Sequence, residues 1–500
     1  MKHTVTFLPD NVSVIVEDNT NLFKAVKAAG VYVLSSCGGK GNCGKCKVVI
    51  KTGTVEGGKT RSFLSAEEAE RDYVLACHSR VKSDLTVEIP QESRMQAKHK
   101  IATGAKTEEI LKLMKQAGGC LESRIHRIYL ELPPPTIDDN IADFERVRRA
   151  LDRAGFSAAN LHMNYMMLSK LSRSLREADW KVTVSVFTVT EVLEVLDIFP
   201  GNATKTRFGA AVDIGTTTIV VYLVDMTNGH IIGTASTYNS QVKCGDDVIS
   251  RIVYATERSG LKELQGLVVN NINTLLADLA EKHKIAPGMI DYIVVAGNTT
   301  MTHLFYGIDP EHIREEPYIP AATFFPPIRG KSVGLQLSPQ AIIYSMPNVA
   351  SYVGGDITAG VLVSQVHKQD AVSLFIDIGT NGEMVLGNKE WLVTAACSAG
   401  PAFEGSGIKF GMRAMEGAIE EVEIDPKTYE VNYRVIGDSK PIGICGSGMI
   451  DILAEMYLNN VIDQKGKIRE EIGSSASGAG KAAWNSWSPG ALRAPSTRRS

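Results

Sequence analysis

The sequence predicts a multidomain protein of the α+β and α/β classes. Its 500 residues exceed what one hydrophobic core usually supports, and an apolar content of 44% is enough for several ordinary cores. Four cysteines gather near the N-terminus, and the tetrapeptide Asp-Ile-Gly-Thr occurs twice, at 213–216 and at 377–380. These observations predict a small N-terminal metal-binding domain and a larger C-terminal domain built from two similar halves.

The overall composition gives no reason to expect nucleic acid or an anionic membrane surface as a partner. Lys and Arg number 53 against 56 Asp and Glu, for a net charge of −3. The chain has no apolar run long enough to span a bilayer, and its start lacks the apolar core of a signal peptide. Cys120, Cys244, Cys397 and Cys445 are dispersed, as is typical of a reducing compartment. We therefore expect a cytoplasmic protein.

The N-terminal cysteines have the spacing of an iron–sulfur site. Cys37, Cys43 and Cys46 follow the pattern C-x5-C-x2-C, and Cys77 comes further along the chain. Plant-type ferredoxins bind a [2Fe–2S] cluster with C-x4-C-x2-C and a fourth, distant cysteine, so the first gap here is one residue longer. Glycines between the cysteines let the loop wrap tightly and point backbone N–H groups at the sulfurs. We expect these four cysteines to bind the two irons.

A zinc site and ordinary core cysteines are the alternatives to a cluster. Zinc sites usually pair two C-x2-C knuckles, and only Cys43 and Cys46 form such a knuckle here. His78 directly follows the last cysteine. Since four cysteines already complete the ligand set, we expect His78 to be a solvated neighbour.

The segments around the cysteines predict several strands and one helix. Residues 3–18 alternate in polarity around a Pro-Asp-Asn turn, which indicates two strands, and residues 21–30 predict a helix. Further strands are expected at 46–55 and 84–90. This order of elements is similar to the β-grasp fold of [2Fe–2S] ferredoxins, and the resemblance covers residues 1–92.

The next segment predicts a linker and a small α/β domain. Residues 93–122 are polar and then weakly amphipathic, which is typical of a tether that lets the cluster domain swing, or of a packed connector. Residues 123–203 contain a strand pattern, then an i, i+4 apolar stripe at 143–155, then a second strand pattern that begins at 180. We find no catalytic constellation in this small middle domain.

The repeated Asp-Ile-Gly-Thr segment predicts a nucleotide site. In each copy an apolar strand ends in an aspartate, a glycine turn follows, and a second strand begins. Such a turn presents backbone N–H groups as an anion-binding nest, to which threonine hydroxyls add donors. Mg²⁺ prefers one or two carboxylates together with phosphate oxygens, so Asp213 and Asp377 can hold it directly or through water. One copy could be an ordinary hairpin, whereas two copies favour phosphate binding.

A third acidic residue and a third Gly-rich turn complete the expected site. Asp356 follows a Gly-Gly turn and is a candidate to orient a water at the terminal phosphate, with N-capping of the next helix as the alternative role. The expected catalytic residues are thus Asp213, Asp377 and Asp356. The expected cofactor-binding residues are Gly215, Thr216, Thr217, Thr218, Gly379, Thr380, Asn381, Gly382, Gly446 and Gly448. An ordinary tight turn is the alternative for each Gly-rich loop.

These motifs together carry a family resemblance. DIGTTT at 213–218 and DIGTNGE at 377–383 resemble the phosphate motifs of the actin, Hsp70 and sugar-kinase (ASKHA) ATPases. With the ferredoxin-like segment, SAGPAFEG at 398–405 and CGSGMID at 445–451, the chain resembles the reductive activators of corrinoid proteins. The resemblance implies an actin/Hsp70-like ATPase domain over 207–473. It also implies a [2Fe–2S] cluster, ATP and Mg²⁺ as cofactors.

The resemblance further implies an ATP-dependent enzyme that reduces a corrinoid from Co(II) to Co(I). Its partner would be a corrinoid protein of a methyltransferase system. A reductase or ferredoxin is expected to supply the electron, because the chain has no flavin or NAD fingerprint. Family members are often homodimers, so a homodimer is also expected. The Co(II)/Co(I) couple is expected below a [2Fe–2S] potential of order −400 mV, so ATP must shift an unfavourable transfer.

The C-terminal end departs from the family pattern. From Ser474 the sequence is rich in Ser, Ala, Gly, Pro and Arg without periodicity. This composition leads us to expect that residues 474–500 are disordered. Family members continue with a Gly-Gly turn that packs on adenosine, so we also expect the ATPase domain to be incomplete. Alternative functions are a ferredoxin-type carrier with a non-functional ATPase domain, or an ATP-driven electron injector for another low-potential acceptor. A sugar or acetate kinase would have no use for the cluster.

Overall fold

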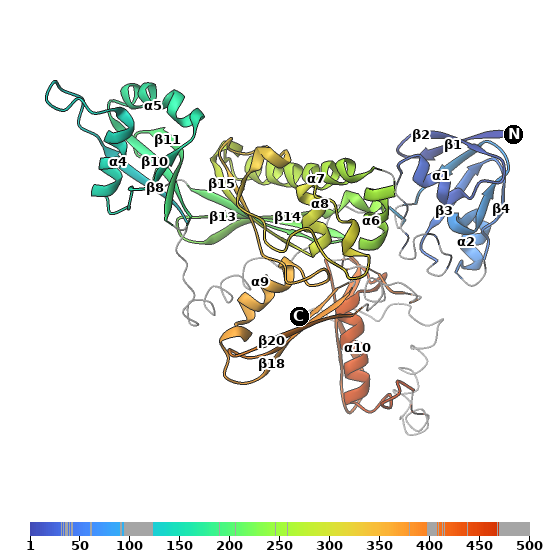
Figure 1. Ribbon diagram of the computed structural model, residues 1–500. Coiled ribbons are helices and arrows are strands. Elements are labelled where there is room, and N and C mark those ends of the chain that lie inside the picture. The colour runs from blue at the N-terminus through green and yellow to red at the C-terminus, as the bar shows by residue number, and fades with distance from the viewer. Residues whose placement is uncertain are drawn as a thin grey trace. The chain divides into compact units, whose positions relative to one another are not determined.

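The structure is a computed structural model that describes residues 1–94 and 124–469 (Figure 1). Within these ranges the description leaves out residues 32, 34, 36–38, 40, 42–43, 61–62, 91–92, 190, 206, 246, 258, 380, 398–407, 409, 413, 415, 438 and 468. The chain divides into two compact units. The first comprises Met1–Lys100, Ile378–Gly382 and Cys397–Ser500, and the second comprises Ile101–Asp377 and Glu383–Ala396.

The N-terminal part of the first unit is a five-stranded mixed sheet with one main helix. The strands have the order β2-β1-β7-β3-β5, in which β1 pairs antiparallel with β2 and parallel with β7. The elements are β1 (Lys2–Leu8), β2 (Val12–Glu17), α1 (Leu22–Ala28), β3 (Lys47–Thr52), β4 (Val55–Gly57), α2 (Ala66–Glu70), β5 (Tyr73–Leu75), β6 (Ser79–Val81) and β7 (Leu85–Glu88). The strands and helix expected between residues 3 and 90 are confirmed.

Alternation along β1 builds the core of this part. Val5 and Phe7 are buried on one face of β1, and α1 buries Leu22, Phe23 and Val26 in the same cluster. Burial of such side chains contributes roughly 1.5–3 kcal/mol each. The sheet and α1 therefore form a stable base for the cysteine loop between α1 and β3.

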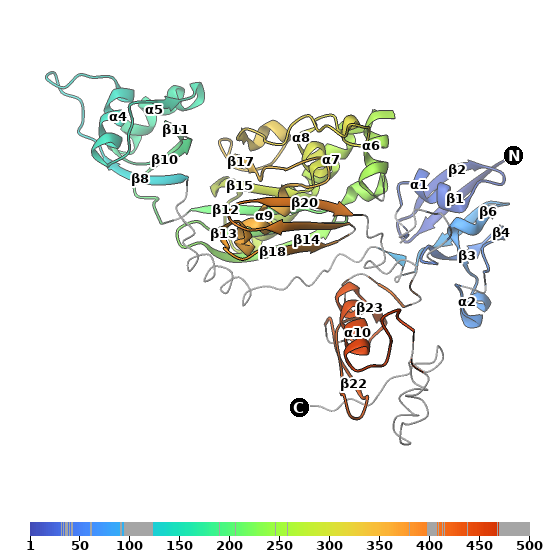
Figure 2. The same cartoon turned by 60° about the horizontal axis from the view of Figure 1, so that its bottom comes forward.

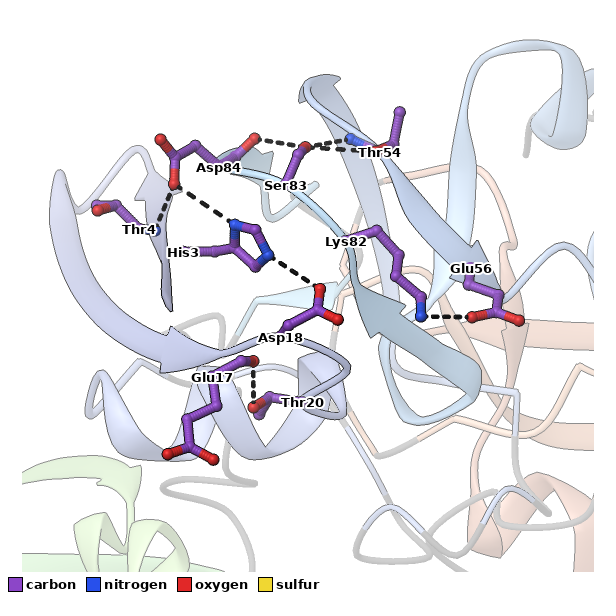
Figure 3. Close-up of polar contacts among 10 residues, drawn as sticks. All are labelled: His3, Thr4, Glu17, Asp18, Thr20, Thr54, Glu56, Lys82, Ser83 and Asp84. Atoms are coloured by element: carbon purple, nitrogen blue, oxygen red, sulfur yellow. Dashed lines mark hydrogen bonds and ion pairs between the residues drawn. The ribbon is translucent and has the colours of Figure 1, made fainter. Parts of the chain in front are cut away.

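Polar contacts at the start of β1 tie two turns together (Figure 3). The Nε2 atom of His3 lies 3.0 Å from Oδ1 of Asp18, and its Nδ1 atom lies 4.0 Å from Oδ1 of Asp84. The backbone N–H of Thr4 donates to the same Asp84 carboxylate at 2.7 Å. The hydrogen bond from His3 lowers the pKa of Asp18 below its ordinary value. His3 thus links the turn after β2 to the turn before β7.

The second unit begins with a four-stranded sheet covered by two helices. The strand order is β8-β10-β11-β9. The elements are β8 (Ile125–Glu131), α4 (Asp143–Arg153), β9 (Leu161–Met163), α5 (Tyr165–Glu177), β10 (Lys181–Val189) and β11 (Val192–Pro200). The helix expected at 143–155 is confirmed, and the strand pattern from 180 is a hairpin of two strands, β10 and β11. The helices bury Val147, Leu151 and Leu175 against this sheet.

A six-stranded sheet forms the centre of the second unit. Its order is β14-β13-β12-β15-β17-β16. The strands are β12 (Phe208–Ile214), β13 (Thr218–Asp225), β14 (His230–Tyr238), β15 (Ile290–Gly297), β16 (Ile328–Arg329) and β17 (Ile342–Ser345). The helices are α6 (Val248–Glu257), α7 (Leu261–Lys282), α8 (Thr299–Tyr306) and α9 (Gly355–Ser364). Helices α7 and α8 pack on one face of the sheet, and α9 contacts β15 on the other (Figure 1).

A buried ion pair joins the small sheet to the large one within the second unit. Arg127 on β8 donates through Nη2 to Oδ2 of Asp291 on β15 at 2.5 Å, and both side chains are buried. Ile125 and Phe187 of the small sheet also pack in one hydrophobic cluster with Ile342 of the large sheet. The two sheets therefore share a core, and the small domain is not loosely attached to the large one.

The second copy of the repeat and the C-terminal segment form smaller sheets (Figure 2). Strands β18 (Ser373–Ile378), β19 (Gly382–Gly387) and β20 (Leu392–Cys397) follow one another in one sheet. Strands β21 (Ala418–Ile424), β22 (Val431–Val435) and β23 (Gly443–Ile444) form another, against which α10 (Gly446–Leu458) packs. Both strand–turn–strand units expected from the repeat are confirmed.

Some expectations fall outside the described residues. These are the linker after residue 94, the Gly-rich loop at 398–405 and the tail at 474–500. The domain limits expected from the sequence stay a prediction. In the part of the chain that the structure describes, no helix combines the length and the apolar character needed to cross a membrane.

Candidate functional site

Two of the four expected cluster cysteines lie side by side in the N-terminal sheet domain. Cys46 directly precedes β3 and is buried, while Cys77 lies in the short turn Ala76–His78 after β5. Their Sγ atoms are 3.1 Å apart, and the Ala76 N–H donates to the Cys46 carbonyl at 2.9 Å. Cys37 and Cys43 are outside the described residues, so the complete ligand set stays a prediction.

The loop around these cysteines fits a cluster. Gly39, Gly41 and Gly44 all have positive φ, at 87°, 90° and 65°. A Cβ atom at Gly39 would lie 2.5 Å from the Phe23 ring, and one at Gly44 would lie 2.6 Å from the Phe63 ring. The 3.1 Å between the Cys46 and Cys77 sulfurs shows that these two side chains converge, although two thiolates on one tetrahedral metal would lie about 3.8 Å apart. The loop therefore needs glycine and brings two of the expected cluster ligands together.

Two polar side chains hold the cluster loop, and one of them was not expected. Asn21 donates through Nδ2 to the carbonyl of Cys77 at 2.8 Å, while its Oδ1 accepts the N–H groups of Phe23 and Lys24 as the N-cap of α1. His78 is exposed, as expected, and its Nε2 lies 3.2 Å from the Gly41 carbonyl. An N-cap asparagine before the cysteine loop was the available signal for Asn21.

The first phosphate-binding candidate is the tight hairpin between β12 and β13. Asp213 lies near the end of β12, and the Gly215 N–H donates to the Thr218 carbonyl at 2.9 Å. A Cβ atom at Gly215 would lie 2.6 Å from that carbonyl oxygen, so glycine is required. Thr216 and Thr217 form the tip of the hairpin. The expected residues Gly215 to Thr218 thus lie together in one turn.

The hairpin is held by polar side chains that the sequence did not single out. Asn239 donates through Nδ2 to the Gly215 carbonyl at 2.9 Å, and Arg251 donates through Nη2 to the Thr216 carbonyl at 2.5 Å. Asn298, the N-cap of α8, donates through Nδ2 to Oγ1 of Thr216 at 3.1 Å. An arginine on the apolar face of α6 was a signal that could have pointed to this network.

The three expected carboxylates are close enough for their charges to interact. Desolvation raises the pKa of Asp213 to about 7, with further contributions from Asp356 and Asp377. Desolvation likewise raises the pKa of Asp356 to about 6, with a smaller contribution from Asp377, and it raises the pKa of Asp377. Asp213 is nevertheless exposed to solvent, and this contact with water lessens the effect of burial on its pKa. A cation placed near these groups would relieve their repulsion.

The alternative role of Asp356 as a helix N-cap is wrong. The N-cap of α9 is Gly354, and Asp356 lies in the first turn, where its Oδ1 accepts the N–H of Ile357 at 2.9 Å. A Cβ atom at Gly354 would lie 2.3 Å from Cα of Asn298. Only glycine therefore permits this close approach, which brings Asp356 toward the start of α8.

The second turn and the third Gly-rich turn belong to the first unit. The Gly379 N–H donates to the Asn381 carbonyl at 2.8 Å, and Gly382 begins β19. Thr380 is outside the described residues. Gly446 begins α10, and a Cβ atom at Gly448 would lie 2.4 Å from the Ile419 carbonyl. Close packing of α10 on β21 thus explains Gly448, and the role of these glycines toward a nucleotide stays a prediction.

Within the described parts of residues 1–94 and 124–469, no three His, Cys, Asp or Glu side chains converge on one metal position.

Four protein-family models match the chain in succession. The 2Fe-2S iron-sulfur cluster binding domain matches residues 5–82, and the RACo linker region matches 115–205. The RACo middle region matches 208–369, and the C-terminal domain of RACo, the ASKHA domain, matches 371–486. The chain therefore combines an iron–sulfur domain with an ASKHA domain, as the sequence motifs predict.

Curated relatives agree with this organisation. The corrinoid activation enzyme RamQ of Eubacterium limosum is 29% identical over 433 residues, which cover 86% of this chain and 66% of that protein. The [Co(II) methylated amine-specific corrinoid protein] reductase of Methanosarcina barkeri is 24% identical over 52% of this chain and 53% of its own length. The chain thus spans between about half and two thirds of these two curated relatives.

A solved structure matches most of the chain. The reductive activator for corrinoid,iron-sulfur protein is 45% identical, has a TM-score of 0.64, and is matched over 94% of this chain and 74% of its own length. That identity and coverage, together with the four family models, place the sequence within one family. This chain belongs to the family of reductive activators of corrinoid proteins.

Proposed function

We propose that the chain uses ATP to drive one-electron reduction of a corrinoid protein. The cysteine loop would hold a [2Fe–2S] cluster that gives up one electron, and that electron would convert Co(II) of the corrinoid to Co(I). The observation that carries the proposal is the occurrence of two sites in one member of this family. These are the glycine-lined pair Cys46 and Cys77, and the hairpin Gly215–Thr218 beside Asp213 and Asp356.

The cysteine loop holds the electron carrier in this proposal. A bound [2Fe–2S] cluster supplies a one-electron couple. Cys37, Cys43, Cys46 and Cys77 would hold its two irons. Asn21 fixes the backbone at Cys77, and the positive-φ glycines keep the loop close to Phe23 and Phe63. A reductase or ferredoxin reloads the electron.

The second unit supplies the nucleotide site. The hairpin N–H groups and the Thr216 and Thr217 hydroxyls bind phosphate oxygens. Asp213 and Asp377 would hold Mg²⁺, directly or through water, and Asp356 would orient the attacking water. Because the pKa of Asp213 is raised to about 7, a bound cation would favour its deprotonated form.

ATP is needed because the electron moves against the potential gradient. Each ~59 mV of uphill gap costs a factor of ten for a one-electron transfer. A nucleotide can offset this only if it binds two states of the complex with different affinity. We propose that binding and hydrolysis of ATP supply this difference.

An anaerobic activation assay tests the proposal. The chain with its cluster, a chemical reductant and a Co(II) corrinoid protein of a methyltransferase system are mixed with Mg-ATP, and Co(I) is followed by its absorbance. Co(I) should form in the wild type and in Asp278→Ala, whose exposed carboxylate lies on α7, but not in Asp213→Ala. Equal Co(I) formation without ATP would indicate a plain electron carrier and would overturn the proposal.

A further inference from the structure

We infer that Arg251, together with Asn239, is a positioning residue that sets the peptide orientation of the nucleotide-binding hairpin. The inference rests on the proposed function of that hairpin. Neither side chain belongs to the three carboxylates or to the phosphate-binding turn itself. Both side chains donate hydrogen bonds to backbone carbonyl groups of the hairpin.

Arg251 is fully buried and is fixed by several acceptors at once. Its exposed fraction is 0%, and it lies on α6 beside the buried Ile252 and Ala255. Nε donates to the Gly245 carbonyl at 2.9 Å, and Nη1 donates to Oε1 of Gln241 at 3.2 Å. Nη2 donates to the Thr216 carbonyl at 2.5 Å. Because the guanidinium is a rigid planar fork, the first two contacts fix where Nη2 can bind Thr216.

Asn239 holds the neighbouring peptide units in the same network. Its exposed fraction is also 0%. Nδ2 donates to the Gly215 carbonyl at 2.9 Å and to Oε1 of Gln241 at 3.2 Å, and its backbone N–H donates to the Thr217 carbonyl at 2.8 Å. Three successive carbonyls, from Gly215 to Thr217, are therefore bound by Asn239 and Arg251. Gln241 connects the two side chains through one oxygen.

The bound carbonyls determine where the hairpin N–H groups point. In a planar trans peptide the C=O and the N–H point in opposite directions. The N–H of Thr216 therefore points away from Asn239, and the N–H of Thr217 points away from Arg251. These are the groups that the proposed function assigns to phosphate binding. Rotation of either peptide unit would turn an oxygen toward the phosphate and repel it.

The positive charge of Arg251 adds to this effect. Burying a guanidinium costs free energy, which its charge-assisted hydrogen bonds must offset. At this position the charge also lies directly behind a turn that binds an anion in the proposed function. Lysine would keep the charge but has no planar fork, so it cannot make the same contacts to Gly245, Gln241 and Thr216 together.

Arg146 provides a matched control for the cost of altering a buried arginine. Its exposed fraction is 1%, and it donates to the carbonyl of Pro133 at 3.1 Å and to the carboxylate of Asp139 at 2.7 Å. It lies on α4 of the small α/β domain. Arg146→Lys should therefore lower stability without changing the hairpin.

The test compares Arg251→Lys with Arg146→Lys in the full chain. Affinity for Mg-ATP is measured by calorimetry, and amide hydrogen exchange of peptides covering residues 213–218 is measured without nucleotide. Arg251→Lys should weaken Mg-ATP binding by about tenfold or more and should speed exchange in the hairpin. Arg146→Lys should do neither, even where both variants lower Tm.

The outcomes separate this inference from the proposed function. Wild-type affinity and wild-type exchange in Arg251→Lys would overturn the inference alone, and so would equal weakening by Arg146→Lys. A folded wild-type chain that binds no Mg-ATP would overturn the proposed function and the inference with it. If Arg251→Lys does not fold, Asn239→Asp carries the test. It loses the amide donor to Gly215 and should weaken Mg-ATP binding in the same way, whereas unchanged affinity would overturn the inference.

Discussion

The side-chain amide of Asn21 donates to the carbonyl of Cys77 at 2.8 Å, across 56 residues of sequence. The same side chain caps α1 through its oxygen. One residue therefore joins the start of a helix to the backbone of a proposed iron ligand. Since hydrogen bonds around a cluster tune its potential, this contact is open to direct measurement.

Asn21→Asp should lower the reduction potential of the cluster. The carboxylate keeps the capping oxygen, so α1 should remain intact. It replaces the donor to Cys77 with a negative oxygen, which repels the carbonyl and disfavours the additional electron on the cluster. A redox titration followed by electron paramagnetic resonance measures the shift. Asn21→Ala serves as the comparison, because it should destabilise the helix start by about 1 kcal/mol without adding charge. An unchanged potential in Asn21→Asp would contradict the expectation.

Gly39→Ala should reduce the cluster content of the chain. Gly39 has φ of 87°, and a Cβ atom there would lie 2.5 Å from the Phe23 ring. Gly30→Ala is a matched control, since Gly30 also has positive φ, at 67°, but a Cβ atom there would meet nothing within 4 Å. Both variants accept a backbone strain of about 1 kcal/mol, and only Gly39→Ala adds a clash. Iron and sulfide per chain, measured after reconstitution, should fall in Gly39→Ala alone.

Stability of the metal-free chain should depend on pH through Asp213. The folded pKa is about 7 and the ordinary value is 3.8, so the folded state favours the protonated acid. The stabilising contribution is full below 3.8 and is lost as pH rises through about 7. Asp213→Asn stays neutral and should show a flatter dependence of Tm on pH between about 5 and 8. Parallel Tm profiles for the two proteins would contradict the raised pKa.

Asp291→Asn should destabilise the second unit. The substitution removes the carboxylate that faces the buried guanidinium of Arg127, and breaking a buried pair typically costs about 3–5 kcal/mol. Glu145→Gln is the control, because Glu145 and Arg148 form an exposed pair on α4 that contributes about 0.5 kcal/mol or less. Tm measured by calorimetry should fall clearly for Asp291→Asn and little for Glu145→Gln. Equal changes would mean that the pair at the shared core contributes no more than a surface pair.

Local patterns in the sequence predicted much of the fold. The alternation along β1 and β2 and the capped start of α1 depend on neighbouring residues, so they can be recognised without tertiary information. The repeated Asp-Ile-Gly-Thr turns were recognisable because each strand pair has its own hydrophobic pattern. Asp213, Asp356 and Asp377, far apart in sequence, are brought close enough to interact.

The supporting contacts could not be predicted in the same way. Arg251 lies 35 residues from the Thr216 carbonyl that it binds, and the two are linked only by the packing of α6 near the hairpin. The first residue of α9 could not be predicted either, because it depends on the close approach of Gly354 to Asn298. For this reason the sequence left N-capping open as an alternative role for Asp356. Such contacts follow from tertiary packing, which a single sequence does not display.

Coupling of ATP hydrolysis to electron transfer is the central claim, and one experiment follows both processes together. Phosphate release and Co(I) formation are measured in a single anaerobic reaction of the reduced chain with a Co(II) corrinoid protein and Mg-ATP. The account predicts that both proceed together and that Co(I) does not accumulate when ATP is omitted. Co(I) formation at the same rate without ATP, or phosphate release without Co(I), would contradict it.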